Sequence, residues 1–280
     1  MHDGTKIVIL GGDLRFQSLA DKLGDKYSVK LYNNQNNISL PDIKLCDFLI
    51  LPLPATQGNS TIISSMENTD LRDIFPLLKS SCVVLSGKIS EKTNLLAKNH
   101  NINIYNYYTD EFETLNAIPS AEGAIEIAMN QTDFTLCGSK ILVLGFGRIG
   151  KTLSKMLSGL GADITVCARR AESLALAKAL GFKNLNLKYL SSQLGFADIV
   201  FNTIPSMIMD KENLNNTKKD VLIIDLASKP GGVDFDYASS LGIKTIHALG
   251  LPAKTSPKTS SNILSDCICS FIEERRTNGT

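Results

Sequence analysis

The sequence predicts an α/β protein made of two doubly wound parallel sheets, that is, two Rossmann-like domains joined by hinge helices. The chain has 280 residues, which is more than one domain usually contains, and 43% of them are hydrophobic. Short apolar runs alternate with helix-like stretches, and this βαβ rhythm restarts near the middle of the chain. A glycine pattern typical of dinucleotide sites opens the second half. These three observations predict a substrate domain followed by a cofactor domain.

The first half contains five short apolar runs, each bounded by turn residues. They are Lys6–Leu10, Val29–Tyr32, Phe48–Leu51, Cys82–Leu85 and Ile102–Tyr105. Apolar runs without polar alternation are typical of strands that are buried on both faces of a parallel sheet. We therefore expect residues 1–118 to form a Rossmann-like substrate domain.

The second half repeats this pattern, and we expect residues 119–259 to form the cofactor domain. Its five predicted strands are Lys140–Leu144, Asp163–Cys167, Asp198–Asn202, Val221–Asp225 and Lys244–Ala248. Between the halves we predict a hinge helix over Pro119–Met129 that begins at Pro119, since proline suits the first turn of a helix. Helical apolar spacing returns in Ser260–Arg276. We expect a C-terminal helix, within residues 260–280, to pack back on the first domain.

Composition excludes several classes of protein. The 29 basic and 28 acidic residues leave a net charge of +1 without a long run of like charge, which argues against nucleic acid or an anionic membrane as a partner. No apolar run approaches the roughly 18 residues of a membrane span, and the N-terminus has no signal-peptide pattern, so we expect a cytoplasmic protein. Six cysteines show neither a CxxC pair nor nearby histidines, and no metal site is expected. Homo-oligomer formation is left open.

The strongest motif follows the strand Lys140–Leu144 and opens a helical pattern. It consists of Gly145, Phe146, Gly147, Arg148, Ile149 and Gly150. In this pattern the first glycine permits a tight turn, the second lets backbone amides approach a pyrophosphate, and the third allows the helix to pack closely on the strand. The helix N-terminus adds a partial positive charge. We therefore predict a dinucleotide site here.

The next strand indicates which dinucleotide is bound. An NAD-binding domain normally has an acidic residue at the end of this strand, to bind the ribose hydroxyls. Here the strand ends in Arg169 and Arg170, whose guanidinium groups suit a 2′-phosphate. We predict NADP(H); the alternative is that both arginines only begin a solvated helix. Loops at later strand ends should line the nicotinamide side, through Thr203, Ile204, Pro205 and Ala227, with Ser206 facing the substrate.

Loops at the ends of the first-domain strands are candidates for substrate binding. Asp13 and Arg15 follow the first strand, where a carboxylate would repel a phosphate, so we do not expect a second dinucleotide site. Arg15 could bind a substrate carboxylate, while Asp13 could either face the substrate or simply cap the next helix. Thr56 and Ser86 follow the third and fourth strands and could face the same cleft.

Three charged residues near the domain boundaries are candidates for catalysis. Glu122 could act as a general acid or base, and Lys229 and Lys258 could each pair with a substrate carboxylate. The alternatives are a solvated helix face for Glu122 and surface positions for the two lysines.

Taken together, these motifs resemble the A subunit of dipicolinate synthase over nearly the whole chain. The matching segments, in order, are Ile9–Asp13, Leu51–Thr56, Ile118–Gly123, Leu144–Gly150, Asn202–Met207, Asp225–Gly232, Gly250–Pro252 and Ser256–Thr259. Two positions depart from the family pattern: Lys229 stands where an arginine is expected, and Lys88 is an extra residue. Both keep or add positive charge.

The resemblance implies an NADP-dependent oxidoreductase that acts with a flavoprotein-like B subunit of the synthase, in the mother cell of a sporulating bacterium. Together the two proteins would form dipicolinate, a pyridine dicarboxylate, from a dihydro- or tetrahydrodipicolinate precursor that branches from lysine biosynthesis. Arg15, Lys229 and Lys258 would then hold the carboxylates of this small dicarboxylate substrate, and Glu122 would handle the proton. Two alternatives stay open: another NADP-dependent two-domain dehydrogenase, of the shikimate or 2-hydroxy acid type, or a non-catalytic NADP-binding partner protein.

Overall fold

A computed structural model describes residues 4–33, 39–57, 60–62 and 69–277 of the chain. The chain divides into two compact units, which we call the first domain (residues 1–115 and 257–280) and the second domain (residues 116–256). The boundaries expected from the sequence, after residues 118 and 259, lie three residues further along the chain at both places.

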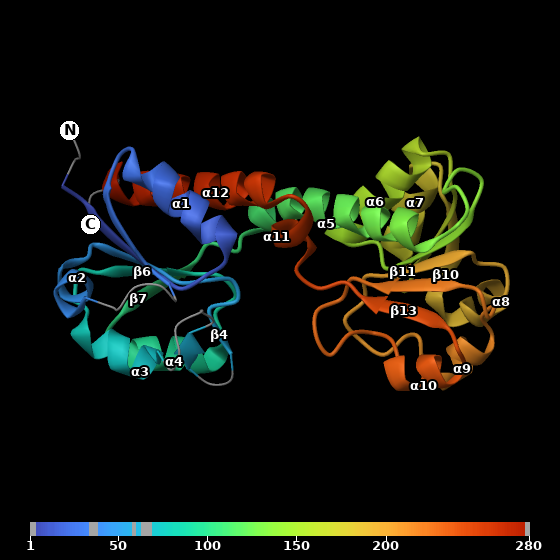
Figure 1. Cartoon of the computed structure of the whole chain (residues 1–280), viewed down its shortest axis with the longest axis horizontal. Helices are drawn as coiled ribbons and strands as arrows, with labels where there is room; N and C mark the ends of the chain where they lie inside the picture. Colours follow the sequence, from blue (N-terminus) through green and yellow to red (C-terminus); the bar gives the residue numbers. More distant parts are fainter. Residues whose placement is uncertain (1–3, 34–38, 58–59, 63–68, 278–280) are drawn as a thin grey trace. The chain divides into compact units, whose positions relative to one another are not determined.

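The first domain is built on a five-stranded parallel sheet in the order β2-β1-β3-β6-β7 (Figure 1). The strands are β1 (Lys6–Leu10), β2 (Ser28–Tyr32), β3 (Phe48–Ile50), β6 (Val83–Ser86) and β7 (Asn103–Asn106). A small antiparallel hairpin, β4 (Thr56–Gln57) and β5 (Thr61–Ile62), follows β3. The strand order reverses between β1 and β3. The loops that follow these two strands therefore leave the carboxyl edge of the sheet on opposite sides and can leave room for a ligand between them.

Helices cover both faces of this sheet (Figure 1). One face carries α1 (Leu14–Gly24) and α12 (Pro257–Thr277), and the other carries α2 (Leu40–Leu45), α3 (Leu71–Ile74), the 3₁₀ turn η1 (Phe75–Leu77) and α4 (Glu91–Asn99). Alternate residues of β1 serve the two layers: Ile7 and Ile9 pack with α1 and α12, while Val8 and Leu10 pack with α2, α3 and α4. This explains why the strand reads as a continuous apolar run.

The C-terminal helix α12 closes one face of the first domain. Leu264, Ile268 and Ile272 are buried against α1 and the sheet, and Lys22 of α1 pairs with Asp266 at 2.6 Å. The helix begins at Pro257 rather than at Ser260, because a proline in the first turn loses no intrahelical hydrogen bond. The last three residues of the predicted helix, 278–280, lie outside the described part of the chain.

The second domain is built on a six-stranded parallel sheet in the order β10-β9-β8-β11-β12-β13. The strands are β8 (Lys140–Leu144), β9 (Asp163–Ala168), β10 (Lys183–Asn186), β11 (Ile199–Asn202), β12 (Leu222–Asp225) and β13 (Lys244–His247). This is the strand order of dinucleotide-binding Rossmann domains, in which ligands bind beyond the carboxyl ends of the strands where the order reverses. In this sheet that point lies between β8 and β11.

Two layers of helices also enclose the second sheet (Figure 1). One contains α5 (Asp110–Gln131), α6 (Arg148–Gly159) and α7 (Ala171–Ala179), and the other contains α8 (Ser191–Leu194), α9 (Lys211–Asn215) and α10 (Phe235–Ser240). Two short segments complete the domain, η2 (Leu187–Tyr189) and α11 (Leu251–Thr255). The predicted fold class, two Rossmann-like parallel-sheet domains, is confirmed.

All ten predicted strands are present, with ends within one residue of the prediction, but the sequence analysis missed the two hairpin strands β4 and β5 and the edge strand β10. Strand β10 reads Lys-Asn-Leu-Asn and pairs only with β9 at the edge of the sheet. An edge strand is not buried on both faces, so it lacks the apolar run that identifies the inner strands.

The prediction that a helix begins at Pro119 was wrong, because Pro119 lies inside α5. The helix starts nine residues earlier, where Thr109 Oγ1 accepts a hydrogen bond from the backbone N–H of Phe112 at 3.2 Å. Asp110, Glu111 and Glu113 in the first turn complement the helix dipole. Pro119 has no backbone N–H to donate to the carbonyl of Leu115. The helix α5 therefore lacks one backbone hydrogen bond near the point where the two domains divide.

The described residues give no sign of a membrane span or a metal cluster. None of their helices is both long and apolar enough to cross a bilayer. No three His, Cys, Asp or Glu side chains among them gather as metal ligands would. Of the cysteines, Cys46, Cys82 and Cys167 are buried in the sheet layers.

Candidate functional site

The glycine loop between β8 and α6 has a geometry that only glycine allows. Gly145 has a φ of 94°, and a Cβ there would lie 2.4 Å from Thr203 Oγ1. A Cβ on Gly150 would lie 2.2 Å from the carbonyl oxygen of Gly145, so α6 packs directly on the loop. The sharp turn and the close approach place the N-terminus of α6 next to the carboxyl end of β8.

The space around Gly147 is empty, whereas neighbouring atoms lie close to Gly145 and Gly150. A Cβ on Gly147 would meet nothing within 4 Å, and as the N-cap residue of α6 it supplies no capping side chain. No side chain of the N-cap residue therefore covers the first turn of the helix, and the partial charge of the helix favours an anion there. This cradle fits the pyrophosphate of a dinucleotide.

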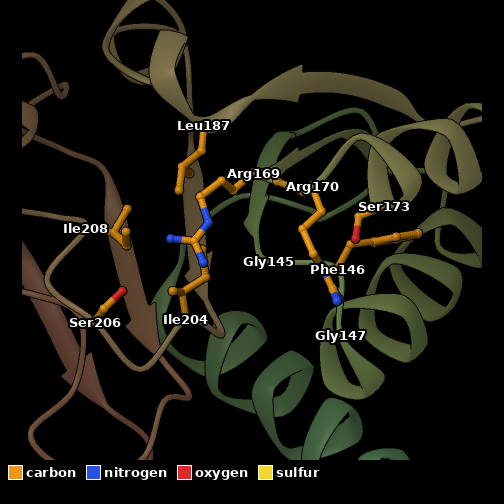
Figure 2. A pocket seen from close by; sticks show the side chains of 11 residues that line it. Gly145, Phe146, Gly147, Arg169, Arg170, Ser173, Leu187, Ile204, Ser206 and Ile208 are labelled. Atoms are coloured by element: carbon orange, nitrogen blue, oxygen red, sulfur yellow. The ribbon is translucent and has the colours of Figure 1, made fainter.

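A pocket surrounds this cradle at the carboxyl ends of β8, β9 and β11 (Figure 2). Its walls consist of Gly145, Phe146, Gly147, Ala168, Arg169, Arg170, Ser173, Leu187, Ile204, Ser206 and Ile208. The structure thus brings seven of the predicted site residues into one place, including both arginines. Ser206, which we predicted to face the substrate, lines this same pocket.

The two arginines give the pocket a positive rim. Both are exposed at the end of β9, and Figure 2 shows the side chain of Arg169 extending toward Ile204 and that of Arg170 toward Gly147. Among the described residues that line the pocket, none is acidic. Burial raises the pKa of the preceding Cys167 thiol to about 12, so this thiol stays neutral and adds no negative charge. The rim therefore carries positive charge that no acidic side chain of the lining offsets.

The other predicted cofactor residues are not among those that line the pocket. The backbone N–H and Oγ1 of Thr203 both donate to the Leu144 carbonyl, each at 2.9 Å, which ties the β11 loop to β8. Pro205 is exposed in the same loop, and Arg148 is exposed in the first turn of α6. The remaining members of this group are Ile149, Gly150 and Ala227.

A buried carboxylate fixes the loops beside the pocket. Asp225 is completely buried at the end of β12, and its Oδ1 accepts hydrogen bonds from Asn202 Nδ2 at 2.8 Å and from the Ala227 N–H at 3.0 Å. Its Oδ2 accepts from the Gly232 N–H at 2.7 Å. Asn202, also fully buried, accepts from the Ile204 N–H at 3.1 Å. One acidic side chain therefore holds the loops after both β11 and β12.

In the first domain, the corresponding helix start is closed. Asp13 caps α1 by accepting a hydrogen bond from the Arg15 N–H at 3.0 Å, and the buried Arg15 side chain pairs with the same carboxylate at 2.7 Å. The capping role of Asp13 is thus observed, and its carboxylate already partners the guanidinium that we expected to bind substrate. The substrate role of Arg15 stays a prediction.

A neutral tyrosine and a buried serine lie at the same carboxyl edge. Tyr107 donates to the Leu51 carbonyl at 2.9 Å, and burial raises its pKa well above the ordinary value. Ser86 is fully buried at the end of β6, and its hydroxyl has no hydrogen-bond partner among the described residues. Thr56 lies in the hairpin strand β4.

The three proposed catalytic residues do not gather in the cofactor pocket. Glu122 lines a separate apolar groove between α5 and α6, with Ile125, Met129 and Leu160 among its neighbours. Lys229 is exposed in the loop that Asp225 anchors. Lys258 was predicted in the second domain but is the second residue of α12, in the first domain, because that helix starts three residues early.

Comparison with known proteins agrees with this geometry. The family model for the N-terminal domain of the dipicolinate synthase A subunit matches residues 6–108. The A subunit of dipicolinate synthase from Bacillus subtilis is 34% identical over 98% of this chain and 98% of its own length. The chain belongs to the A-subunit family of dipicolinate synthase. The predicted resemblance is confirmed.

Solved structures extend the similarity to three dimensions. The crystal structure of the dipicolinate synthase A subunit from Bacillus halodurans has a TM-score of 0.86 and 30% identity over 97% of this chain and 98% of that one. The corresponding crystal structure from Bacillus subtilis has the same score and identity over 100% of this chain and 99% of that one.

The second domain also matches a described family of cofactor domains. Residues 120–233 match the family described as "D-isomer specific 2-hydroxyacid dehydrogenase, NAD binding domain". The chain is thus a dehydrogenase-type protein, an oxidoreductase whose second domain takes a nicotinamide cofactor.

Sequence reasoning missed several residues of the site. Ala168, Ser173, Leu187 and Ile208 line the pocket without belonging to any motif that we recognised. Ser173 lies in the first turn of α7, and no signal in the sequence distinguishes it from the other serines. The Asn202–Asp225 network left a weak signal, namely two polar residues that end otherwise apolar strands.

Replacing Asp225 by Asn tests the anchor of these loops. The amide would turn one acceptor oxygen into a donor that faces other donors, so we expect a loss of about 2 kcal/mol or more in the free energy of unfolding, together with weaker cofactor binding. Denaturant unfolding followed by circular dichroism measures the first effect, and cofactor titration measures the second. Asp220→Asn, at an exposed position just before β12, is the matched control and should behave as wild type. Equal unfolding midpoints for Asp225→Asn and wild type would contradict the proposed anchoring.

Proposed function

We propose that this chain is the NADP-dependent component of an oxidoreductase that forms dipicolinate from a dihydro- or tetrahydrodipicolinate precursor. Membership of the dipicolinate synthase A-subunit family supports the product, and the pocket at the carboxyl edge of the second sheet supports the cofactor. The observation that carries the choice of NADP(H) is the pair Arg169 and Arg170 at the end of β9.

The preference for NADP(H) follows from charge. A 2′-phosphate carries negative charge and several acceptor oxygens, which two guanidinium groups can bind in a fork. NAD(H) offers only hydroxyl groups there, and those favour the acidic residue that this strand end lacks. The matched family is described as NAD binding, and these two arginines stand where an NAD-binding domain normally has an acidic residue.

The substrate proposal rests on cations that could neutralise two carboxylates. Lys229 and Lys258 have exposed positions, whereas Arg15 is already paired with Asp13. We propose that the two lysines make the principal contacts and that Arg15 contributes while sharing its charge with Asp13. A bound nicotinamide cofactor would supply the hydride acceptor for the oxidation of a dihydropyridine to a pyridine, a reaction that aromatisation favours. The protein's own task is to orient the ring, balance its charge and accept a proton.

Glu122 remains our proposal for the group that accepts the proton. Its place in the groove between α5 and α6, apart from the cofactor pocket, makes it the least supported of the proposed catalytic residues. Because the relatives are named as the A component of a synthase, we propose a partner, the flavoprotein-like B subunit. A second candidate function, oxidation of a 2-hydroxy acid, is favoured only by the match of residues 120–233 to a 2-hydroxyacid dehydrogenase family.

The cofactor proposal predicts a measurable preference. Wild-type chain should bind NADPH at least about tenfold more tightly than NADH, or about 1.4 kcal/mol. Changing both Arg169 and Arg170 to Ala should remove most of this difference by weakening NADPH and sparing NADH. Isothermal titration measures all four affinities, and Lys188→Ala, an exposed cation in η2, is the control for nonspecific charge. Equal wild-type affinities for the two cofactors would refute the proposal.

The partner proposal predicts that dipicolinate forms only in a mixture. Purified chain, a purified B subunit from a related system, NADP⁺ and the precursor should together produce the ultraviolet absorbance of a pyridine dicarboxylate. Either protein alone should leave the absorbance unchanged, because each would supply only part of the reaction. Full turnover by this chain alone would show that no partner is required, and turnover of 2-hydroxy acids instead would favour the second candidate.

The substrate proposal predicts selective kinetic defects in that mixture. Lys229→Ala and Lys258→Ala should each lower kcat/KM for the precursor by about tenfold or more, since a charge-assisted contact contributes roughly 1.5 to 3 kcal/mol. NADPH affinity should stay within about twofold of wild type, because both lysines lie outside the cofactor pocket. Lys211→Ala, in the exposed helix α9, is the control. Unaltered kinetics in both variants would identify them as solvated surface lysines.

A further inference from the structure

We propose that Ser173 is a specificity-determining residue for the 2′-phosphate of the cofactor, acting with the free amides in the first turn of α7. The inference rests on the proposed NADP(H) function and adds to it a residue that no motif points to. It predicts that the phosphate is bound from two sides, by the two arginines and by this helix start.

Ser173 is a buried serine that opens into the pocket. Only 9% of the residue is exposed, yet it lines the same pocket as Arg169 and Arg170. Figure 2 shows its hydroxyl on the pocket side of the helix, beside Phe146 and the side chain of Arg170. No described residue forms a hydrogen bond with this hydroxyl. The hydroxyl oxygen is not among the buried side-chain atoms that lack a partner, so it reaches the open space of the pocket, where a bound group can donate to it or accept from it.

The place of Ser173 in its helix explains why the hydroxyl is free. Serine and threonine inside helices usually donate to the carbonyl four residues earlier, as Ser120 does to Asn116 at 2.8 Å and Thr152 does to Arg148 at 3.0 Å. For Ser173 that residue would be Arg169, which precedes the helix. The hydroxyl therefore has no local partner and can turn toward the pocket.

The start of α7 lacks the cap that other helices of the chain have. Its N-cap residue is Arg170, whose side chain has no hydrogen-bond acceptor and makes no capping hydrogen bond. By contrast, the side chains of Asp210 and Asp234 cap α9 and α10. The first-turn amides of α7 are thus available to an anion, as those of α6 are at Gly147. Two uncapped helix starts at one pocket match the two phosphate positions of NADP(H).

Ser154 provides a matched control for this hydroxyl. It is a fully buried serine in α6, its hydroxyl also has no hydrogen-bond partner among the described residues, and it does not line the pocket. Removing either hydroxyl deletes an unpartnered polar atom and should leave thermal stability unchanged or slightly raised. Only Ser173→Ala should alter the affinity for a 2′-phosphate.

Titration of the full chain with four probes tests the proposal: NADPH, NADH, adenosine 2′,5′-bisphosphate and 5′-AMP. Ser173→Ala should weaken NADPH and adenosine 2′,5′-bisphosphate by about tenfold, the size of one charge-assisted contact, and change NADH and 5′-AMP by less than about twofold. Ser173→Thr, which keeps a hydroxyl, should restore most of the affinity. Ser154→Ala should match wild type with all four probes.

The outcomes separate this inference from the function on which it rests. Wild type that prefers NADPH, together with a Ser173→Ala variant that keeps this preference in full, would overturn the inference alone. An equal loss for NADPH and NADH would also overturn it, since the serine would then shape the pocket in general. Wild type without any preference for NADPH would overturn the proposed cofactor and this inference together.

Discussion

The buried carboxylate of Asp225 is the interaction on which the cofactor domain depends. It accepts hydrogen bonds from Asn202, Ala227 and Gly232, and so links the ends of two adjacent strands to the loops that follow them. Thr203 continues the link to β8, where the glycine loop begins. These hydrogen bonds hold the loops after β11 and β12 at the edge where the strand order reverses. A fixed edge is needed because a dinucleotide contacts several of these loops at once.

The two Rossmann-like domains differ in how the helix after their first strand begins, and only one of the two starts is open to an anion. In the first domain Asp13 caps α1 and pairs with Arg15, so the helix start carries its own carboxylate and excludes a phosphate. In the second domain the helix start at Gly147 has no cap and opens into the pocket. The same architecture thus provides one closed and one open anion site. Only the open one matches a dinucleotide site, and we propose that the first domain contributes to substrate binding.

Much of this could be predicted from the sequence, because inner strands and glycine loops leave direct signals. Strands buried on both faces read as apolar runs, and the spacing of Gly145, Gly147 and Gly150 reports a turn and a close approach that no other residue allows. Features that depend on tertiary context were missed or misplaced. The edge strand β10 carries no apolar run. The start of α5 is set by Thr109 and three acidic residues, so Pro119 was a misleading signal. Ser173 is one of many serines in the sequence, and only the fold reveals that it borders the pocket.

Above all, we propose that NADP(H) occupies the pocket between the glycine loop and the start of α7. A crystal structure of the chain with NADP⁺ tests it most directly. We expect electron density for the pyrophosphate at the amides that follow Gly147, and for the 2′-phosphate between Arg169, Arg170 and Ser173. Density for the cofactor at the carboxyl edge of the first sheet, or a 2′-phosphate that points into solvent away from α7, would contradict it.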